Sequence, residues 1–337
     1  MSSFSEKIIS CYRIAEELNL YYMYIICRVP ERTSPACRTG EVRFPGMEED
    51  GEKRRSFPEK TLFIGRNRKN VYITFCIRRI AIMKLCRKNL AAQLYTIREY
   101  TKTPKDIAES MKKIKAIGYD AVQISGLGPV DNKELLSILD GEGLVCCASH
   151  DSAAAIVDRT DEVIERLLAL KCPYTAYPYP HIQWTCEEDC LKLAAALNEA
   201  GAKLKAAGIT LCYHNHALEF EKFNGRTVLD ILYSASTAEN LKGEPDTYWV
   251  QQGGANPVSW IRKLSGRMPL LHLKDSGFRG GKQIMTEIGS GNLEWKPILE
   301  AADEAGCLWY IVEQDICPAS PFDSLKMSYD YLSENFF

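Results

Sequence analysis

Three short strings in the second half of the chain combine side chains that bind metal ions or transfer protons. They are His214-Asn215-His216-Ala217-Leu218-Glu219, His272-Leu273-Lys274-Asp275 and Glu313-Gln314-Asp315. Each closes an apolar run typical of a β-strand, at 209–213, 268–271 and 309–312. Mixed imidazole and carboxylate ligands suit a divalent ion such as Mn, Mg, Co or Zn, with coordination positions left for substrate oxygens. The strings therefore indicate a metal site.

Further candidate residues fall at the same level of the predicted strands. All five histidines lie at or just after a strand end: His150, His181, His214, His216 and His272. The carboxylates Glu219, Asp246 and Glu313 accompany them. A single histidine in such a place is usually an ordinary polar residue, but five on one rim favour a functional site.

The fifth predicted strand leaves alternatives open. Period-two alternation places His214 and His216 on one face. Glu219 follows after a turn, and either folds back over the site or pairs with Lys222. Lys274, two residues after His272, either supplies a cation near a developing oxyanion or neutralises Asp246 and Glu313.

Such a site fits the removal of a proton next to a carbonyl. A divalent ion polarises the carbonyl and the adjacent hydroxyl, which lowers the barrier to an enediolate. A carboxylate or imidazole then removes the carbon-bound proton and returns it to the same or a neighbouring carbon. We expect the catalytic groups to be His214, His216, Lys274 and Glu313. Isomerisation, epimerisation and dehydration of sugars share this first step.

The elements that must position these groups alternate from Lys88 onward. Strands are predicted at 89–95, 121–125, 144–150, 174–179, 210–216, 248–251, 270–274 and 309–314. Helical 3.6 spacing lies between them, as in Ile107, Met111, Ile114 and Ile117 before Gly118, or in Leu191, Leu193, Ala194, Leu197 and Leu204 before Gly208. Eight such units predict an α/β fold, the (β/α)8 TIM barrel, whose strands share one C-terminal mouth. A doubly wound open sheet is the alternative.

Residues 1–82 do not follow this pattern. They contain a predicted helix from Ser5 to Ile26, a stretch rich in Pro, Arg and Glu at 29–60, and a β-like run at 71–77. We interpret them as an N-terminal extension that is poorly ordered or not native, with Met83 as the natural start; an accessory domain is the alternative. Residues 83–337 are the predicted barrel, and their 255 residues match the typical length of about 250.

Composition and charge exclude several classes of protein. The hydrophobic fraction of 46% and charged fraction of 26% are those of an ordinary globular chain. Residues 1–82 carry 15 Lys and Arg against 10 Asp and Glu, so the rest, with 27 against 34, is acidic. This argues against a nucleic-acid partner. The 13 cysteines show no CxxC spacing, which favours reduced thiols of a cytoplasmic protein.

We find no signal peptide and no apolar run of about 20 residues, so no membrane partner is expected. The expected partner is a small-molecule sugar, and a homo-oligomer is compatible with the sequence. Two glycine motifs are weak. Gly126-Leu127-Gly128 lacks the rest of a dinucleotide fingerprint. Gly289-Ser290-Gly291 is either a phosphate site or a plain loop that leads into a helix.

The chain resembles the sugar phosphate isomerase/epimerase family, with its xylose isomerase-like TIM barrel, over about residues 88–335. The matching strings are Gln93-Leu94-Tyr95-Thr96, Ile117-Gly118-Tyr119, Tyr213-His214-Asn215-His216 with Glu219-Phe220, Asp246-Thr247-Tyr248-Trp249-Val250, His272-Leu273-Lys274-Asp275, Glu287-Ile288-Gly289-Ser290-Gly291 and Val312-Glu313-Gln314-Asp315. In this order they are specific for the family and not for one substrate.

The resemblance implies a divalent metal held by four side chains, typically Glu, Asp, His and Glu. Asp246, His272 and Glu313 match the last three, and for the first we favour Glu219 over His214. His150 matches a substrate-facing histidine, and we expect Gln123 and Trp249 to contact substrate as well. The chain departs from the commoner pattern of the family at two positions. Gln123 stands where relatives often carry Glu, and Asn256 stands where they often carry Asp; the second change affects only a helix cap.

The leading interpretation is a metal-dependent isomerase or epimerase of a sugar, keto-sugar or sugar phosphate. A lyase similar to inosose dehydratase, on the same barrel, is the second. A DNA repair enzyme similar to endonuclease IV is a third, although it needs a three-zinc cluster with more ligands and a basic face. A sugar-binding protein without catalysis is the last alternative.

Overall fold

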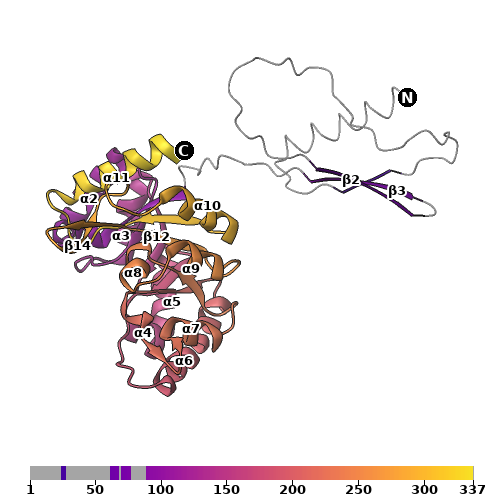
Figure 1. Ribbon diagram of the computed structural model, residues 1–337. Coiled ribbons are helices and arrows are strands. Elements are labelled where there is room, and N and C mark those ends of the chain that lie inside the picture. The colour runs from indigo at the N-terminus through magenta and orange to yellow at the C-terminus, as the bar shows by residue number, and fades with distance from the viewer. Residues whose placement is uncertain (1–23, 28–60, 68–69, 77–88, 337) are drawn as a thin grey trace, which may run out of the picture. The chain divides into compact units, whose positions relative to one another are not determined.

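The computed structural model describes residues 24–27, 61–67, 70–76 and 89–336. The chain divides into two units, 1–82 and 83–337. In the first unit, strands β1 (Tyr24–Cys27), β2 (Thr61–Asn67) and β3 (Asn70–Cys76) form an antiparallel sheet in the order β1-β3-β2. Figure 1 labels β2 and β3. The β-like run at 71–77 corresponds to β3. The helix expected from Ser5 to Ile26 is wrong over 24–26, where Tyr and Ile favour a strand; its other residues lie outside the described ones.

The second unit is a TIM barrel with an eight-stranded parallel sheet. Its strands are β4 (Leu90–Gln93), β5 (Ala121–Ile124), β6 (Val145–His150), β7 (Tyr174–Tyr177), β8 (Thr210–His214), β11 (Lys242–Glu244), β12 (Leu270–Leu273) and β15 (Trp309–Val312). They pair in the order β11-β8-β7-β6-β5-β4-β15-β12. A single bridge between Asp246 and His272 links the two ends of this order, so the sheet nearly closes.

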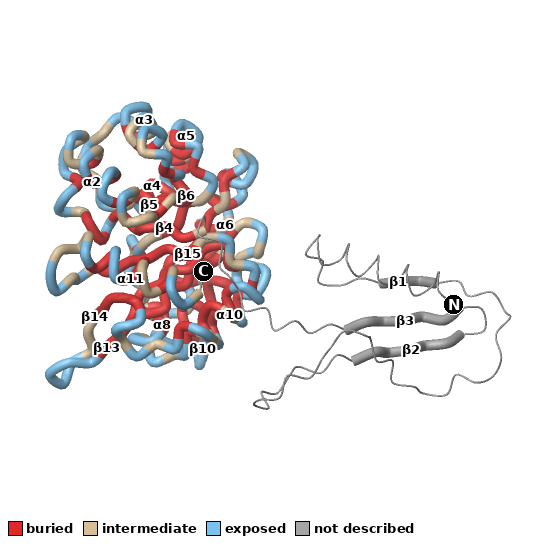
Figure 2. Tube along the Cα trace, turned by 90° about the horizontal axis from the view of Figure 1, so that it is seen from above, coloured by how far each residue is buried: buried red, intermediate tan, exposed pale blue. Residues whose placement is uncertain are grey.

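Burial explains why the strands read as nearly continuous apolar runs. β4, β5 and β12 are buried at every residue, because side chains fill the barrel on one face and helices cover the other. Figure 2 shows the strands buried at the centre, with exposed turns on the surrounding helices. Each strand points its C-terminal end at the same mouth, and this places the candidate site there.

The predicted helical patterns are confirmed. α2 (Pro104–Ile117) buries Ile107, Met111 and Ile114 and ends at Gly118, whose φ of 126° suits glycine. α6 (Glu187–Ala206) buries Leu193, Ala194, Leu197 and Leu204, whereas Leu191 is exposed. The other helices are α3 (Asn132–Glu142), α4 (Ala153–Asp158), α5 (Thr160–Ala169), α7 (Val228–Ser234), α8 (Thr247–Gln252), α9 (Pro257–Lys263), α10 (Trp295–Ala305) and α11 (Pro321–Phe336). Among the residues described, no helix has the length and apolarity to cross a membrane.

The sixth strand lies earlier than the sequence pattern predicts. Residues 248–251 belong to α8, and the strand is β11, Lys242-Gly243-Glu244. The apolar residues Tyr248 and Val250 pack as a helix because the Asp246 side chain accepts a hydrogen bond from the backbone N–H of Trp249 and caps the first turn. Asp246 therefore follows the sixth strand directly. Asn256 caps α9 in the same way, as expected.

Candidate metal centre

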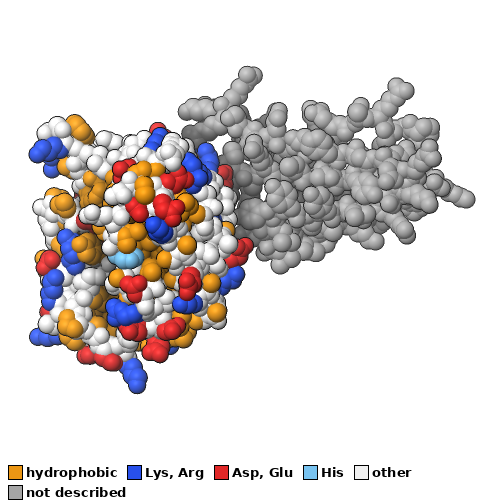
Figure 3. Space-filling model, turned by 90° about the horizontal axis from the view of Figure 1, so that it is seen from below, with side chains coloured by type: hydrophobic (Ala, Val, Ile, Leu, Met, Phe, Trp, Pro, Cys, Tyr) orange, Lys and Arg blue, Asp and Glu red, His pale blue; other side chains and the backbone are white. Residues whose placement is uncertain are grey.

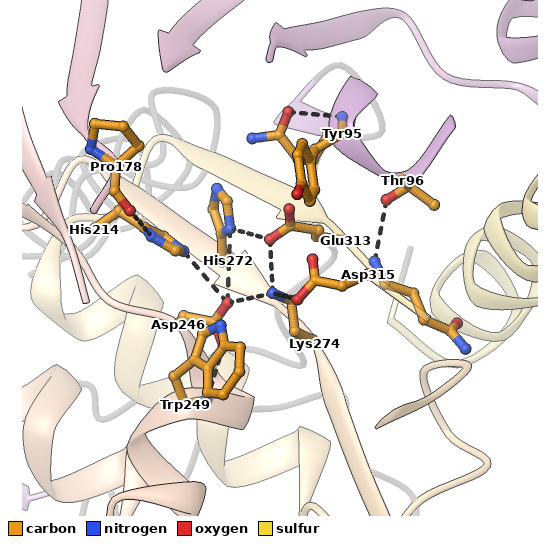
Figure 4. Close-up of polar contacts among 12 residues, drawn as sticks. Tyr95, Thr96, Pro178, His214, Asp246, Trp249, His272, Lys274, Glu313 and Asp315 are labelled. Carbon is orange, nitrogen blue, oxygen red and sulfur yellow. Dashed lines mark hydrogen bonds and ion pairs between the residues drawn. The ribbon is translucent and has the colours of Figure 1, made fainter. Parts of the chain in front are cut away.

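Four side chains from separate strands converge in the barrel mouth. One ligand atom from each of His214, Asp246, His272 and Glu313 lies within 4.8 Å of the others, and all four residues are buried. We call these four residues the candidate metal centre. Figure 4 shows His214, Asp246, His272 and Glu313 pointing toward one another. They come from the ends of β8, β11, β12 and β15, so neighbouring strands of the barrel supply all of them.

Hydrogen bonds between side chains and the backbone hold the loop that carries Asp246. Asn215 is 1% exposed, and its side-chain oxygen accepts a hydrogen bond from the Asp246 N–H at 3.3 Å. The hydroxyl of Thr247 donates to the backbone oxygen of Lys274 at 2.8 Å and accepts from its N–H at 3.0 Å. The loop after β11 is thus clamped between β8 and β12, which fixes the carboxylate of Asp246.

The spacing of the donor atoms fits a divalent ion. Asp246 Oδ2 lies 3.4 Å from His214 Nε2 and 3.8 Å from His272 Nδ1, and His272 Nδ1 lies 3.0 Å from Glu313 Oε2. Ligands at the usual Zn–N and Zn–O distances in a tetrahedron are about 3.3–3.6 Å apart. Two nitrogens and two carboxylate oxygens form a donor set that Zn, Mn or Co accepts.

An unpartnered nitrogen supports the same interpretation. The Nδ1 of His214 lies 3.2 Å from the carbonyl oxygen of Pro178, which leaves Nε2 facing Asp246. His214 Nε2 is buried without a hydrogen-bond partner among the described residues, whereas Asp246 Oδ2 is paired with the ammonium of Lys274 at 3.1 Å. A buried polar atom without a partner costs about 1–3 kcal/mol, so the free nitrogen of His214 fits the role of a metal ligand.

A buried lysine shares the carboxylates of the centre. Lys274 is 1% exposed, and its Nζ lies 2.8 Å from Glu313, 3.1 Å from Asp246 and 3.1 Å from Asp315. Burial disfavours the ammonium, but these carboxylates outweigh it and hold the pKa of Lys274 above its ordinary value. The ammonium therefore balances the negative charge that surrounds it.

The carboxylates of the site are held ionised in the same way. Burial acts to raise the pKa of Asp246 and of Glu313, but Lys274 and the neighbouring histidines outweigh it and leave both below the ordinary range. Burial lowers the pKa of His272, yet Glu244, Asp246 and Glu313 raise it well above normal overall. Burial and the charge of Glu313 raise the pKa of Asp315 to about 6.

A second layer of polar side chains lies against His272. The Nε2 of His272 donates to Gln123 Oε1 at 2.6 Å, and Gln123 Nε2 donates to Glu244 Oε1 at 2.6 Å. Glu244 Oε2 lies 2.7 Å from His150 Nε2, and Gln93 Nε2 donates to Gln123 Oε1 at 2.6 Å. Because Nε2 of His272 is occupied by Gln123, its Nδ1 is the nitrogen available to an ion.

His150 and Gln123 differ in their access to a substrate. Gln123 is fully buried with its amide engaged on both sides, so it lies beneath the centre, and its contact with substrate stays a prediction. His150 is partly buried, and its ring stacks 5.3 Å from that of His272. His150 and Glu244 also form a second potential ligand group with His272.

Glu219 lies outside the candidate metal centre. Its carboxylate accepts a hydrogen bond from the hydroxyl of Tyr213 at 3.0 Å and another from the N–H of His216 at 2.7 Å. Burial raises its pKa to about 7 despite these donors. Glu219 therefore braces the turn after β8, and the position in the group of four that we expected it to take is filled by His214.

The remaining predicted residues line the mouth around the centre. The His216 ring lies 5.0 Å from the rings of both Trp249 and Tyr179, and Lys274 Nζ lies 5.4 Å from the Trp249 ring. His216 Nδ1, Trp249 Nε1 and Asp315 Oδ1 are buried without hydrogen-bond partners among the described residues. His181 stands apart, with Nδ1 2.5 Å from the Tyr177 hydroxyl.

Glu244 and Asp315 are the main residues of the site that sequence reasoning missed. Glu244 closes the sixth strand, which was placed too late in the chain. Asp315 stands in one of the opening strings, but it was given no role there. Period-two alternation from Glu313 would have placed it on the same face as Glu313. The sequence therefore points to both residues. Glu244, however, can be found only when the sixth strand is placed correctly.

The segment Gly289-Ser290-Gly291 is a loop whose N–H groups are already in use. The carboxylate of Asp275 accepts from the N–H groups of Gly289, Gly291 and Leu293 and from the indole of Trp295. A Cβ on Gly291 would come within 2.3 Å of Asp275 Oδ1. An internal carboxylate thus occupies the place where we considered a phosphate, and the plain-loop interpretation is the one that fits.

Comparison with known proteins agrees with the barrel fold described above. A family model described as a xylose isomerase-like TIM barrel matches residues 111–328. The chain belongs to this family. The resemblance inferred from the motifs is therefore confirmed.

Two known relatives are inosose dehydratases. The protein from Clostridium beijerinckii is 26% identical over 175 residues, 44% of this chain and 55% of that protein. The one from Lacticaseibacillus casei is 25% identical over 166 residues, 43% of this chain and 54% of that protein. The matches span about half the length of these relatives.

Among solved structures, a sugar phosphate isomerase/epimerase from Parabacteroides distasonis is similar with a TM-score of 0.64. It is 22% identical, and the match covers 74% of this chain and 94% of that one. At this identity the likeness concerns the fold.

Proposed function

We propose that this member of the family is a metal-dependent enzyme that removes a proton next to the carbonyl of a sugar or keto-sugar and returns it through an enediolate, as an isomerase or epimerase. The observation that carries the proposal is the convergence of His214, Asp246, His272 and Glu313 at the barrel mouth. The family supports an enzymatic role, because its characterised members include isomerases, epimerases and dehydratases.

His214, Asp246, His272 and Glu313 would hold the ion, through the ligand atoms whose spacing is described above. A bound divalent ion would polarise the carbonyl and the neighbouring hydroxyl of the substrate. With His214 as a ligand, its imidazole is no longer free to transfer protons. We therefore assign that step to other residues of the mouth.

Two side chains are suited to move the proton. His216 Nδ1 and Asp315 Oδ1 are buried and without partners among the described residues. They follow β8 and β15, between which β11 and β12 lie in the barrel, so they approach the site from different directions. Lys274 contacts Asp315 at 3.1 Å and would keep a positive charge beside a developing enediolate oxygen.

A second candidate is a dehydratase on the same site. The inosose dehydratases that match this chain support it, since loss of water can follow the same proton removal. An enzyme similar to endonuclease IV has less support. In the described part of the chain the second ligand group shares His272 with the first, and Gln123 and His150 already engage its Glu244.

The test is proton exchange in D₂O. The purified full chain is loaded with Mn, Co or Zn and incubated with free sugars, phosphorylated sugars and inososes. NMR then detects deuterium at the carbon next to the carbonyl, and mass spectrometry detects a product lighter by one water. We expect exchange to be lost in Asp315→Asn and His216→Asn while metal content stays stoichiometric.

Asp303→Asn, an exposed aspartate on α10, is the matched control and should exchange like the unmodified protein. Exchange without loss of water identifies an isomerase or epimerase, and loss of water identifies the dehydratase. If the metal-loaded protein exchanges no substrate proton on any of the three classes, the proposed function is wrong.

A further inference from the structure

A pocket of about 320 Å³ adjoins the candidate metal centre. It is lined by residues 124–130 from the end of β5 onward, residues 150–152 from the end of β6 onward, Asn132 and Leu135 of α3, and Arg166 of α5. We call it the β5–β6 pocket. His150 belongs to its lining, and the His150 ring lies 5.3 Å from that of His272 and 5.0 Å from that of His214. The pocket therefore begins at the edge of the centre, and its volume lies at the small end of the ~300–1,000 Å³ range of ligand sites.

The wall of the pocket is fixed by backbone contacts. The N–H of Gly128 donates to the carbonyl oxygen of Thr101 at 2.8 Å, and a Cβ at Gly128 would lie 2.1 Å from the carbonyl oxygen of Lys102. Gly126, at a φ of 67°, packs against the ring of Tyr95. A wall held in this way keeps its shape without a ligand, as preformed sites do.

The carboxylate and the guanidinium that line the pocket form an ion pair. Arg166 Nη1 lies 2.5 Å from Asp151 Oδ1 and 3.1 Å from the hydroxyl of Ser149. The other oxygen of Asp151 accepts from the hydroxyl of Thr175 at 2.9 Å, and Asp151 is only 7% exposed. A paired guanidinium and carboxylate offer donors and acceptors to hydroxyl groups, but the carboxylate repels an anion.

Other groups near the centre are equally unsuited to a phosphate. Lys274 is shared by three carboxylates. Asp275 occupies the N–H groups of the loop that contains Gly289 and Gly291. A phosphate would therefore meet carboxylates on each of these sides, although the fold is shared with proteins called sugar phosphate isomerases.

We propose that the β5–β6 pocket binds an uncharged, hydroxyl-bearing part of the substrate, about the size of a second sugar ring, while the reacting carbonyl lies at the metal centre. This inference rests on the proposed function and specifies its substrate class as neutral and larger than a single free sugar. Asp151 and Arg166 contact the hydroxyl groups, and Ser152 borders the space that this part fills.

The experiment compares three probes on the metal-loaded full chain: a free ketohexose, its 6-phosphate, and a disaccharide with a ketose end. Ser152→Trp narrows the pocket without removing a cap hydrogen bond, since the Ser152 side chain makes none at the start of α4. We expect the ratio of kcat/KM for disaccharide over ketohexose to fall by about tenfold. Ser137→Trp, at an exposed serine of α3 outside the pocket, is the control and should leave the ratio unchanged.

Asp151→Asn tests the charge argument with inorganic phosphate as probe. It leaves the guanidinium of Arg166 without its carboxylate, so phosphate should inhibit this variant and not the unmodified protein. Preferred turnover of the 6-phosphate, or an unchanged ratio in Ser152→Trp, would overturn the inference and leave the proposed function intact. Calorimetric binding of the disaccharide without proton exchange would support the inference and overturn the function. Failure of every neutral probe to bind would overturn the inference.

Discussion

The two sides of the barrel mouth differ in charge. β4, β5 and β6 contribute Gln93, Gln123 and His150, whereas β11, β12 and β15 contribute the ionised groups of Glu244, Asp246, Lys274 and Glu313. All of these residues are buried or nearly so. The first side supplies amides and an imidazole that form hydrogen bonds, and the second concentrates carboxylates and the ammonium of Lys274.

This difference shows how so many ionisable groups can be buried together. A buried charge needs both a partner and hydrogen bonds. Lys274 partners three carboxylates, and the amide of Gln123 satisfies Glu244 and His272 at the same time. The first side orients the candidate ligands, and the second carries most of the groups to which the proposed chemistry is assigned. Figure 3 shows that, on one outer face, acidic and basic side chains are instead interspersed, where water screens them.

The largest effect is expected when a ligand on the charged side is neutralised. Asp246→Asn keeps the cap on α8 but weakens the hold on the ion, so we expect loss of stoichiometric metal and a fall in turnover of roughly 10³-fold. Elemental analysis and steady-state rates measure the two effects. Asp303→Asn should change neither, and an Asp246→Asn protein with full metal would show that the ligand set is wrong.

Removal of the buried cation should separate charge balance from metal binding. Lys274→Met leaves three carboxylates without their ammonium and should lower the free energy of unfolding by about 3–5 kcal/mol. Added divalent ion should restore much of the lost free energy of unfolding, because a ligand that binds only the folded state stabilises that state. Thermal unfolding with and without metal measures both effects.

Lys326→Met, at an exposed ion pair on α11, is the control for this change and should alter stability little. Equal melting temperatures for Lys274→Met and Lys326→Met would contradict the idea that Lys274 balances the site.

A change at the junction of the two sides should have a smaller effect. Glu244→Gln removes the charge that faces His150 and His272, so both rings lose a partner that fixes their orientation. We expect the metal affinity to fall by about 10–100-fold while the fold is kept. Titration with Zn or Co measures the affinity, and Glu239→Gln is a control at an exposed glutamate. Unchanged affinity in Glu244→Gln would mean that the second layer does not orient His272.

The smallest effect concerns Glu219, which neither side includes. Its pKa of about 7 lies above that of an unfolded glutamate, so its contribution to stability is full below about pH 4.5 and is lost as the pH rises through 7. Glu219→Gln can donate to Tyr213 and accept from His216, so at pH 8 we expect a gain of about 1–2 kcal/mol and no pH dependence from this site. Urea unfolding at pH 5 and pH 8 measures the gain.

Metal content of the same variant separates Glu219 from His214. Glu219→Gln should keep its metal, and His214→Asn should lose it, because the Nε2 of His214 faces Asp246. The reverse result would restore Glu219 as the ligand.

Much of the barrel could be predicted from the sequence because its strands carry a strong local signal. Apolar runs such as Leu270–Leu273 and Trp309–Val312, each followed by chemically active side chains, gave both the strand and the site residues. The sixth strand could not be found in this way. Lys242-Gly243-Glu244 has three residues and no apolar side chain, and it is a strand only because β8 pairs with it.

The order of residues determined which side chains are available to the site. They are imidazoles and carboxylates at the ends of strands that must share one mouth. The tertiary structure alone decided which of them meet. β8 ends at His214, so alternation stops there, and the turn that follows carries Glu219 to Tyr213 rather than to the centre. Asp246, His272 and Glu313 are far apart in the sequence, and their distances depend on the near closure of the sheet, which no local pattern encodes.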